Sequence, residues 1–274
     1  MEWREADGVR WLEASMPGVT AAFTTRLGGV SESPFDQLNL GALTDDRPDA
    51  VVENRRRLAS ALGFPPEQIA FSHQVHGADL LTHADPPLRC SFAPRDGVGA
   101  QRKRGGDSLP DADGHVIASR GVAGLVFVAD CVPVALSGPG GAAMLHCGWR
   151  GLAAGIIARG AAAIRATDAA IGPSIGPCCY EVGEEVLDLF AGLADEVAEG
   201  RKLNLPAATE RLLRDAGVAR IELSGLCTSC EPELFFSHRR DRGRTGRQAG
   251  LVWHSTGVPE VVPPYGWQTS GTGG

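Results

Sequence analysis

The sequence lacks the long hydrophobic runs and the excess of positive charge that mark two large classes of protein. No run of 18 or more apolar residues occurs in the 274-residue chain, so we expect no membrane-spanning helix. The formal net charge is −7, which argues against general nucleic-acid binding and makes any anion site local. Residues 1–18 are acidic and mixed, without the apolar segment of a signal peptide, and we therefore expect a cytoplasmic protein.

The cysteines give little sign of pairing. Seven is an odd number in a chain of this length, which argues against a disulfide framework and favours free thiols. Cys227 and Cys230 form a lone C-x-x-C motif without a second such pair, so we expect no second metal or redox site there. Cys178 and Cys179 lie in a loop rich in glycine and proline, and we interpret them as packing or loop thiols.

What is present is a mixture of helix and strand patterns without a regular alternation. Apolar residues make up 43% of the chain, enough to bury a large core. The patterns predict strands over 124–136, 142–146 and 220–227, and helices over 49–62, 151–167, 184–200 and 204–218. Asn204 is the expected cap of the last helix. This mixture favours an α+β fold with mixed sheets over a doubly wound one.

Two segments fall outside these patterns. Residues 88–110 are polar, locally basic and rich in glycine and proline, which is typical of a long surface loop. Residues 255–274 are rich in proline and glycine, and we expect an extended or frayed tail. No internal repeat is visible, and we expect residues 1–274 to form a single domain.

The first candidate for chemistry is Cys131, which follows Asp130 inside the apolar run at 124–136. Burying this ionisable pair costs free energy unless a partner compensates. Pro133 indicates a strand edge, bulge or break nearby. If the next strand folds back as a hairpin, an even-numbered loop places Cys131 and His146 on one face. An odd-numbered loop would instead place Cys147 with Cys131.

Two more histidines, His73 and His76, are three residues apart in "SHQVHG". One cysteine and two histidines form a known catalytic zinc ligand set, which leaves a fourth position for water or substrate. The alternative is a nucleophilic Cys131 with His146 as its base. His73 fits a surface or packed histidine better than it fits a proton shuttle of the site, which is the alternative.

Several blocks in fixed order resemble a known bacterial family. They are "FTTRLGGVS", "FDQLNLG", "NRRRLASALG", "QVHG", "DADGHV", "VADCVPVAL", "HCGWRGLAAGI", "IGPSIGPCCYEVGEEV" and "CTSCEPELFFSHRRDRGRTGRQAGLV". The family is variously called laccase-domain or multicopper polyphenol oxidase, purine nucleoside phosphorylase and peptidoglycan editing factor. The blocks run from about residue 21 to 253, so the resemblance covers nearly the whole chain.

The resemblance implies a single α+β domain with mixed sheets between helix layers, similar to cysteine-hydrolase-like toxins. It implies a zinc site formed by His76, Cys131 and His146, which are also the implied catalytic residues. The implied activities are phosphorolysis of adenosine, inosine, guanosine and methylthioadenosine, and hydrolytic deamination of adenosine. The polyphenol-oxidase name implies copper as the cofactor instead of zinc. We favour copper less, because multicopper sites need more histidines than the seven scattered here readily supply.

The sequence departs from the usual pattern of this family in four places. Cys147 and Gly114 stand where alanine is common, and His238 stands where tyrosine is common. The loop at 88–110 is longer than usual. None of these changes removes an implied ligand, but His238 can alter substrate preference and the loop can alter access.

Phosphorolysis also needs a phosphate ion, and arginine is the side chain best suited to hold one. Arg26 lies on a glycine-rich turn and Arg150 lies close to His146, so both are candidate phosphate ligands. "RRDRGRTGR" adds five arginines, which also fit a solvated basic loop. Asp113 is grouped with the substrate-site residues and can hold a histidine ring nitrogen. A cap or turn role is the alternative for Asp113, and Asp130 has the same two alternatives: it either holds a histidine ring nitrogen or has a turn role.

Three hypotheses follow. The first is a cytoplasmic zinc enzyme that acts on purine nucleosides and phosphate. The second is an amidase-type hydrolase that edits peptidoglycan precursors with Cys131 as its nucleophile. The third is a non-catalytic binding protein of the same fold, which the intact His76, Cys131 and His146 disfavour.

Overall fold

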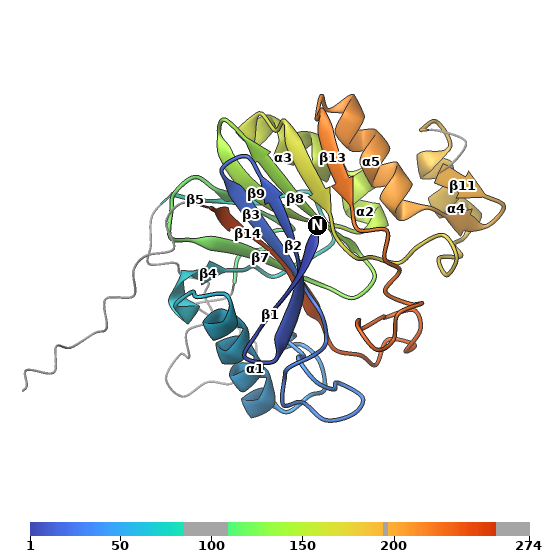
Figure 1. The fold of residues 1–274 in the computed structure, drawn as a ribbon. Helices are drawn as coiled ribbons and strands as arrows, with labels where there is room; N and C mark the ends of the chain where they lie inside the picture. Colours follow the sequence, from blue (N-terminus) through green and yellow to red (C-terminus); the bar gives the residue numbers. More distant parts are fainter. Residues whose placement is uncertain (85–108, 194–196, 256–274) are drawn as a thin grey trace, which may run out of the picture.

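Two six-stranded β-sheets form the centre of the structure, a computed structural model that describes residues 1–84, 109–193 and 197–255 (Figure 1). Across the first sheet the strands are β1 (Glu2–Ala6), β2 (Val9–Met16), β3 (Val19–Thr24), β14 (Gln248–His254), β7 (Ala123–Val128) and β4 (Ile69–Ala70). Across the second they are β13 (Arg220–Leu223), β10 (Asp168–Ile171), β8 (Val132–Gly138), β9 (Gly141–Cys147), β6 (Gly114–Ile117) and β5 (Leu80–His83). Most of the loop predicted at 88–110 and of the tail predicted at 255–274 lies outside the described residues.

Both sheets are mixed and pack face to face. β4 runs parallel to β7, β5 to β6 and β10 to β13, while the other pairs within the two sheets are antiparallel. Phe23 and Val252 of the first sheet share one buried cluster with Met144 and Ala135 of the second. Burial of these apolar side chains between the sheets is the main force that joins them.

Helices cover the outer faces of the two sheets. They are α1 (Pro48–Ala61), α2 (Trp149–Ala153), α3 (Ile156–Ile164), α4 (Glu184–Leu187) and α5 (Leu205–Asp215), with short 3-10 turns η1 (Pro66–Gln68) and η2 (Asp188–Phe190). α1 packs on the first sheet and α3 and α5 pack on the second, on opposite sides of the molecule (Figure 1). The predicted fold class, mixed sheets between helix layers, is confirmed. In the described part of the chain, no helix is both long and apolar enough to cross a membrane.

Local sequence signals explain several helix ends. The side chain of Asn204 accepts a hydrogen bond from the Ala207 N–H at 3.2 Å, so it caps α5 as predicted. The helix predicted over 151–167 is divided into α2 and α3, because Gly155 has a φ of +84° and turns the chain between them.

The single strand predicted over 124–136 is wrong in one respect. The chain forms β7, turns at residues 129–131 and continues as β8, which belongs to the other sheet. Asp130 has a φ of +92°, a conformation outside the extended region, and this turn carries Cys131 from one sheet to the other. The apolar pattern does not reveal the break because both strands are buried.

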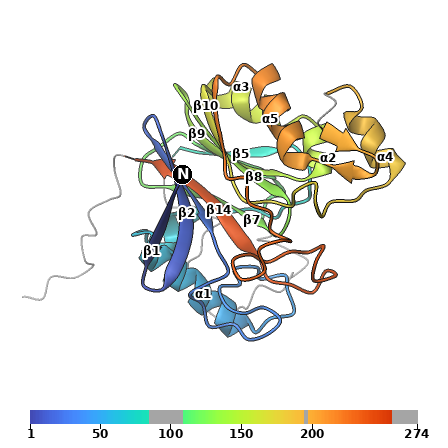
Figure 2. The same cartoon turned by 45° about the vertical axis from the view of Figure 1, so that its right-hand side comes forward.

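The helix predicted over 184–200 is also wrong. In the described residues, its first half consists of the short α4 and η2, and its end belongs to a small hairpin of β11 (Ala198–Glu199) and β12 (Lys202–Leu203) around Gly200, whose φ is +59°. Leu203 is fully buried in the same cluster as α5, so tertiary packing outweighs the helical pattern. α4 lies beyond α5 at the end of the second sheet (Figure 2).

Candidate metal and catalytic site

Three side chains from separate segments converge at one end of the second sheet. His76 lies in the loop between β4 and β5, Cys131 in the turn before β8, and His146 on β9. Their ligand atoms all lie within 4.8 Å of one another, and the two imidazole rings are 4.8 Å apart between centroids. His76 is exposed and His146 is buried, so the group lies at the surface and is anchored in the core.

The hairpin register explains why Cys131 and His146 meet. Gly138 pairs with Gly141 around a two-residue loop, and Pro133 lies opposite His146. Cys131 precedes Pro133 by two residues and therefore shares the face of His146. The even-loop alternative is the correct one. Cys147 pairs with Val132 and is buried in the cluster beneath α3.

Asp113, directly before β6, fixes the geometry of both histidines. Its Oδ1 lies 2.8 Å from Nδ1 of His146 and accepts the His76 backbone N–H at 2.9 Å. Its Oδ2 accepts the Gly77 and Val75 N–H groups at 2.7 and 3.1 Å. Because a carboxylate only accepts, Nδ1 of His146 carries the proton and Nε2 is left as the ligand atom.

The same carboxyl group is fully buried and ionised. Burial alone would raise the pKa of Asp113, but the hydrogen bond and charge of His146, with the backbone N–H groups, lower it below its usual range. Asp113 therefore holds His146 and the "QVHG" turn, and its buried oxygens are all engaged in doing so.

Cys131 and His146 form a coupled pair of charges. Burial alone would raise the pKa of the Cys131 thiol, but the charge and hydrogen bonds of His146 and His76 lower it to about 6. Burial alone would lower the pKa of His146, but the charge of Cys131 and the hydrogen bond to Asp113 raise it to about 9. The sulfur is thus a thiolate near neutral pH, the form that binds metals and acts as a nucleophile.

Two roles were predicted for Asp130, and its contacts are those of the turn role. Its Oδ1 accepts the hydroxyl of Thr228 at 2.7 Å and its Oδ2 accepts the Arg239 N–H at 2.7 Å. Its carbonyl accepts the Ile175 N–H at 2.9 Å. These contacts hold the strained residue that precedes Cys131, so Asp130 positions the sulfur through the backbone.

Gly148 is a part of the site that the sequence did not single out. A Cβ at this position would lie 3.1 Å from Sγ of Cys131 and 3.2 Å from Cδ2 of His76. The residue begins α2 with an extended backbone that any amino acid adopts, so space rather than conformation requires glycine here.

The arginines predicted to hold phosphate have other contacts. Arg26 donates to the carbonyl groups of Asp36 at 2.5 Å and Pro232 at 3.0 Å, and it lies over the ring of Phe236. It lines a surface hollow of about 460 Å³ together with Arg240 and other polar residues. The Arg150 guanidinium lies 4.3 Å from the ring centroid of Trp149.

The charge of Cys131 also affects the pKa values of two further residues. Burial, then the charges of Cys131 and Asp130, raise the pKa of Tyr180 to about 12. Burial lowers the pKa of Arg247, and the same two negative charges oppose that change. Tyr180 was not predicted as a site residue, although its place directly after "PCC" in a glycine- and proline-rich loop is a sequence signal for an unusual backbone conformation.

His73 lies outside the ligand group, as predicted. Its Nδ1 is 2.7 Å from Oδ1 of Asp111, with which it also forms an isolated β-bridge. The other cysteines predicted as packing or loop thiols lie in loops, where four of them form a second group. Cys178, Cys179, Cys227 and Cys230 come from two loops and bring their sulfurs within 4.8 Å of one another.

Comparisons with known proteins identify the family of the chain. Residues 20–255 match a family model described as multi-copper polyphenol oxidoreductase laccase. The chain is 40% identical to purine nucleoside phosphorylase YlmD of Geobacillus stearothermophilus, over 91% of this chain and 95% of that one. It is 36% identical to purine nucleoside phosphorylase YfiH of Escherichia coli, over 86% and 94%.

Solved structures give the same result for the fold. The crystal structure of the Bacillus licheniformis hypothetical protein YfiH superposes with a TM-score of 0.78 at 33% identity, covering 92% of this chain and 98% of that chain. The crystal structure of YlmD from Geobacillus stearothermophilus gives a TM-score of 0.76 at 37% identity, covering 92% and 97%.

Proposed function

Because the chain belongs to the family described as multi-copper polyphenol oxidoreductase laccase, whose relatives include named purine nucleoside phosphorylases, we propose that it is a zinc-dependent enzyme of purine nucleosides. It cleaves adenosine, inosine, guanosine and methylthioadenosine with phosphate, giving the free base and a sugar 1-phosphate. It also deaminates adenosine with water, giving inosine and ammonia.

One observation carries the proposal: His76, Cys131 and His146 converge on one point. Asp113 holds Nδ1 of His146 and so leaves Nε2 of that ring free to bind a metal. Two imidazoles and one thiolate form a zinc donor set, and three protein ligands leave a position for a reacting group. The described cysteines are all free, which suits a reducing compartment, and we place the activity in the cytoplasm.

When bound, zinc supplies Lewis-acid chemistry at this point, where it stabilises developing negative charge. The chain's own residues do the rest. Asp113 keeps Nδ1 of His146 protonated and its ring fixed, and Gly148 leaves room beside Cys131. Trp149 directly follows Gly148, and Tyr180 lies close enough to Cys131 for the two groups to interact electrostatically. We assign to these two rings the stacking of the purine base.

We assign phosphate binding to Arg150 and Arg26. Arg150 follows Gly148 by two residues, and its guanidinium packs on the ring of Trp149. Within the described part of the chain, Arg150 forms no ion pair that phosphate would have to displace. Arg26 forms an ion pair with Asp36 at 3.3 Å, so phosphate must compete with that carboxylate. The Arg150 assignment therefore predicts the larger rise in the KM for phosphate when each arginine is replaced by glutamine.

The test is a product assay with purified, zinc-loaded protein. Adenosine is incubated with and without phosphate, and adenine, inosine and hypoxanthine are separated by chromatography. We expect adenine only with phosphate, inosine with or without it, and neither with Cys131→Ala. Wild-type protein that forms no more of either product than Cys131→Ala contradicts the proposal.

A second function is supported by the pair of Cys131 and His146. The thiol pKa of about 6 and the orientation of His146 by Asp113 also fit a cysteine nucleophile, as in amidase-type editing of peptidoglycan precursors. Metal analysis separates the two functions. Stoichiometric zinc that is lost in His76→Ala supports the zinc enzyme, whereas a metal-free protein inactivated by alkylation of Cys131 supports the nucleophile.

Copper-dependent polyphenol oxidation is the activity that the family description suggests, and the donor set favours it less. All seven histidines are described, and in the described part of the chain His76 and His146 are the histidines that share a possible metal site. His83 and His115 contact each other at 2.9 Å on β5 and β6, in a separate place. Multicopper centres need more histidines in one cluster than this.

A further inference from the structure

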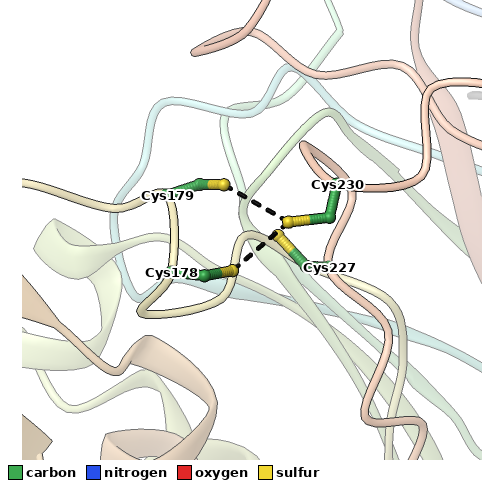
Figure 3. A group of neighbouring side chains, drawn as sticks. All are labelled: Cys178, Cys179, Cys227 and Cys230. Atoms are coloured by element: carbon green, nitrogen blue, oxygen red, sulfur yellow. Dashed lines mark hydrogen bonds between the residues drawn. The ribbon is translucent and has the colours of Figure 1, made fainter.

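Four cysteines form a compact group that the proposed activity does not use. Cys178 and Cys179 come from the loop after β10, and Cys227 and Cys230 from the turn after β13 (Figure 3). The four side chains point toward a common centre in Figure 3. Sγ of Cys230 lies 3.4 Å from that of Cys178 and 3.4 Å from that of Cys179, and all four sulfurs lie within 4.8 Å.

These distances match a tetrahedron of thiolates better than they match disulfides. Zinc–sulfur bonds of about 2.3 Å in a tetrahedron place the sulfurs about 3.8 Å apart. A disulfide requires about 2.05 Å, and the four cysteines are free. A set of four sulfurs without oxygen or nitrogen donors selects borderline or soft ions and forms a closed, structural site.

Backbone contacts hold the two cysteine loops together around the four sulfurs. The Gly176 N–H donates to Sγ of Cys227 at 3.2 Å, and a hydrogen bond of this kind stabilises a thiolate. Ser174 and Cys227 form a parallel β-bridge that joins the two loops. A Cβ on Gly176 would lie 3.3 Å from Sγ of Cys178, so glycine allows the loops to approach this closely.

We propose that Cys178, Cys179, Cys227 and Cys230 bind one zinc ion as a structural tetrathiolate site, separate from the site at Cys131. The ion joins two loops whose cysteine pairs are about 50 residues apart in the chain. Both loops also hold Asp130, through the Ile175 N–H at 2.9 Å and the Thr228 hydroxyl at 2.7 Å. The tetrathiolate therefore secures the turn that presents Cys131.

The site lies at the surface. Cys178 and Cys230 are exposed, and Cys179 and Cys227 are half-buried, so chelators and alkylating reagents reach the sulfurs. This exposure makes the site testable in the folded protein without unfolding it.

The experiment measures zinc per chain after anaerobic purification with a reductant and removal of loosely bound metal. We expect two zinc ions in the wild type, one in Cys178→Ser/Cys230→Ser, one in His76→Ala/Cys131→Ala, and two in the matched control Ser229→Ala. With cobalt in place of zinc, the thiolate-to-cobalt charge-transfer absorption is expected to fall by more than half in the first double variant.

A measurement on the wild type covers the case in which a variant does not fold. The four cysteines are alkylated with N-ethylmaleimide and mapped by mass spectrometry, with zinc and after chelation. We expect zinc to slow the modification of all four together by at least tenfold. Equal reactivity with and without zinc, disulfides among the four, or iron in place of zinc would each overturn the assignment, and none of these results depends on enzymatic activity.

Discussion

At the scale of single residues, Asp113 links the core to the site. One buried carboxylate accepts hydrogen bonds from the His146 ring and from the backbone of the "QVHG" turn. It therefore sets the positions of two of the three proposed ligands without touching the metal. A ligand histidine that loses such a partner also loses its fixed tautomer and orientation.

Replacement of Asp113 by asparagine tests this role. Asparagine has one acceptor oxygen where aspartate has two, so it cannot accept hydrogen bonds from both the His146 ring and the turn backbone as Asp113 does. We therefore expect zinc affinity at the His76/Cys131/His146 site to fall about 10- to 100-fold. Competition with a chromophoric chelator measures the affinity. Asp111→Asn, which removes the partner of His73 instead, is the matched control and should leave the affinity unchanged. Equal loss in both variants would contradict the role of Asp113.

The sequence identified some of these residues and not others for physical reasons. His76, Cys131, His146 and Asp113 stand in local motifs, so the resemblance locates them without knowledge of the fold. The meeting of Cys178 and Cys179 with Cys227 and Cys230 depends on how β10 and β13 pair, which no local pattern records. The sequence therefore shows only a lone C-x-x-C motif, because its second pair of cysteines is brought to it by the parallel strands.

At the scale of elements, turns rather than strands determine the site. The turn at Asp130 moves the chain from one sheet to the other, and Gly148 begins α2 against Cys131. The strand alternation that places Cys131 with His146 was predictable once the loop length was known. The break in the strand and the short α4 were not, because burial on both sides gives strands, broken strands and buried helices similar apolar patterns.

Replacement of Gly148 by alanine tests the close approach. The added Cβ meets Cys131 and His76 at about 3.1–3.2 Å, so one of them must shift. We expect kcat/KM for adenosine to fall about 10- to 100-fold while the fold is retained, as measured by steady-state kinetics and circular dichroism. Gly192→Ala, where nothing lies within 4 Å of the new atom, should behave like the wild type. An active Gly148→Ala enzyme would contradict this account of the site.

A buried histidine on β6 predicts how stability depends on pH. Burial first, and then the charge of His83, lower the pKa of His115 to about 3. In the unfolded chain the pKa is about 6.5, so between these values the unfolded state binds a proton that the folded state does not. Stability from this residue is therefore present above pH 6.5 and is lost as the pH falls.

We expect the free energy of unfolding to fall by about 1.5 kcal/mol between pH 6.5 and pH 5 because of His115. Urea unfolding at the two pH values measures the change. His115→Gln should show a shallower dependence than the wild type, whereas His73→Gln, a change at a partly exposed histidine, should keep the steep one. The same slope in His115→Gln and wild type would show that His115 does not carry the effect.

At the scale of the whole molecule, we expect the proposed metal binding to be coupled to folding. The two sheets supply a large buried core, but the loops that hold Cys131 are joined mainly by hydrogen bonds and by the four-cysteine group. An ion that binds only the folded state raises stability according to its concentration relative to Kd. The proposed tetrathiolate is thus expected to stabilise the end of the second sheet at which His76, Cys131 and His146 meet.

Zinc at about 100 times the Kd of a site should stabilise the protein by about 2.7 kcal/mol for each site filled and raise Tm by about 5–10 °C per site. Differential scanning calorimetry of chelated and zinc-loaded wild type measures the shift. Cys178→Ser/Cys230→Ser should show a smaller increase than Ser229→Ala. An equal increase in both variants would assign the stabilisation to the other site alone.

The most direct test of the central claim is the initial rate of adenine release from adenosine and phosphate as zinc is added to metal-free protein. The account predicts no release without metal, a rise that saturates once the His76, Cys131 and His146 site is filled, and no rise in His146→Ala. Adenine release that is independent of zinc, or that persists in His146→Ala, would contradict it.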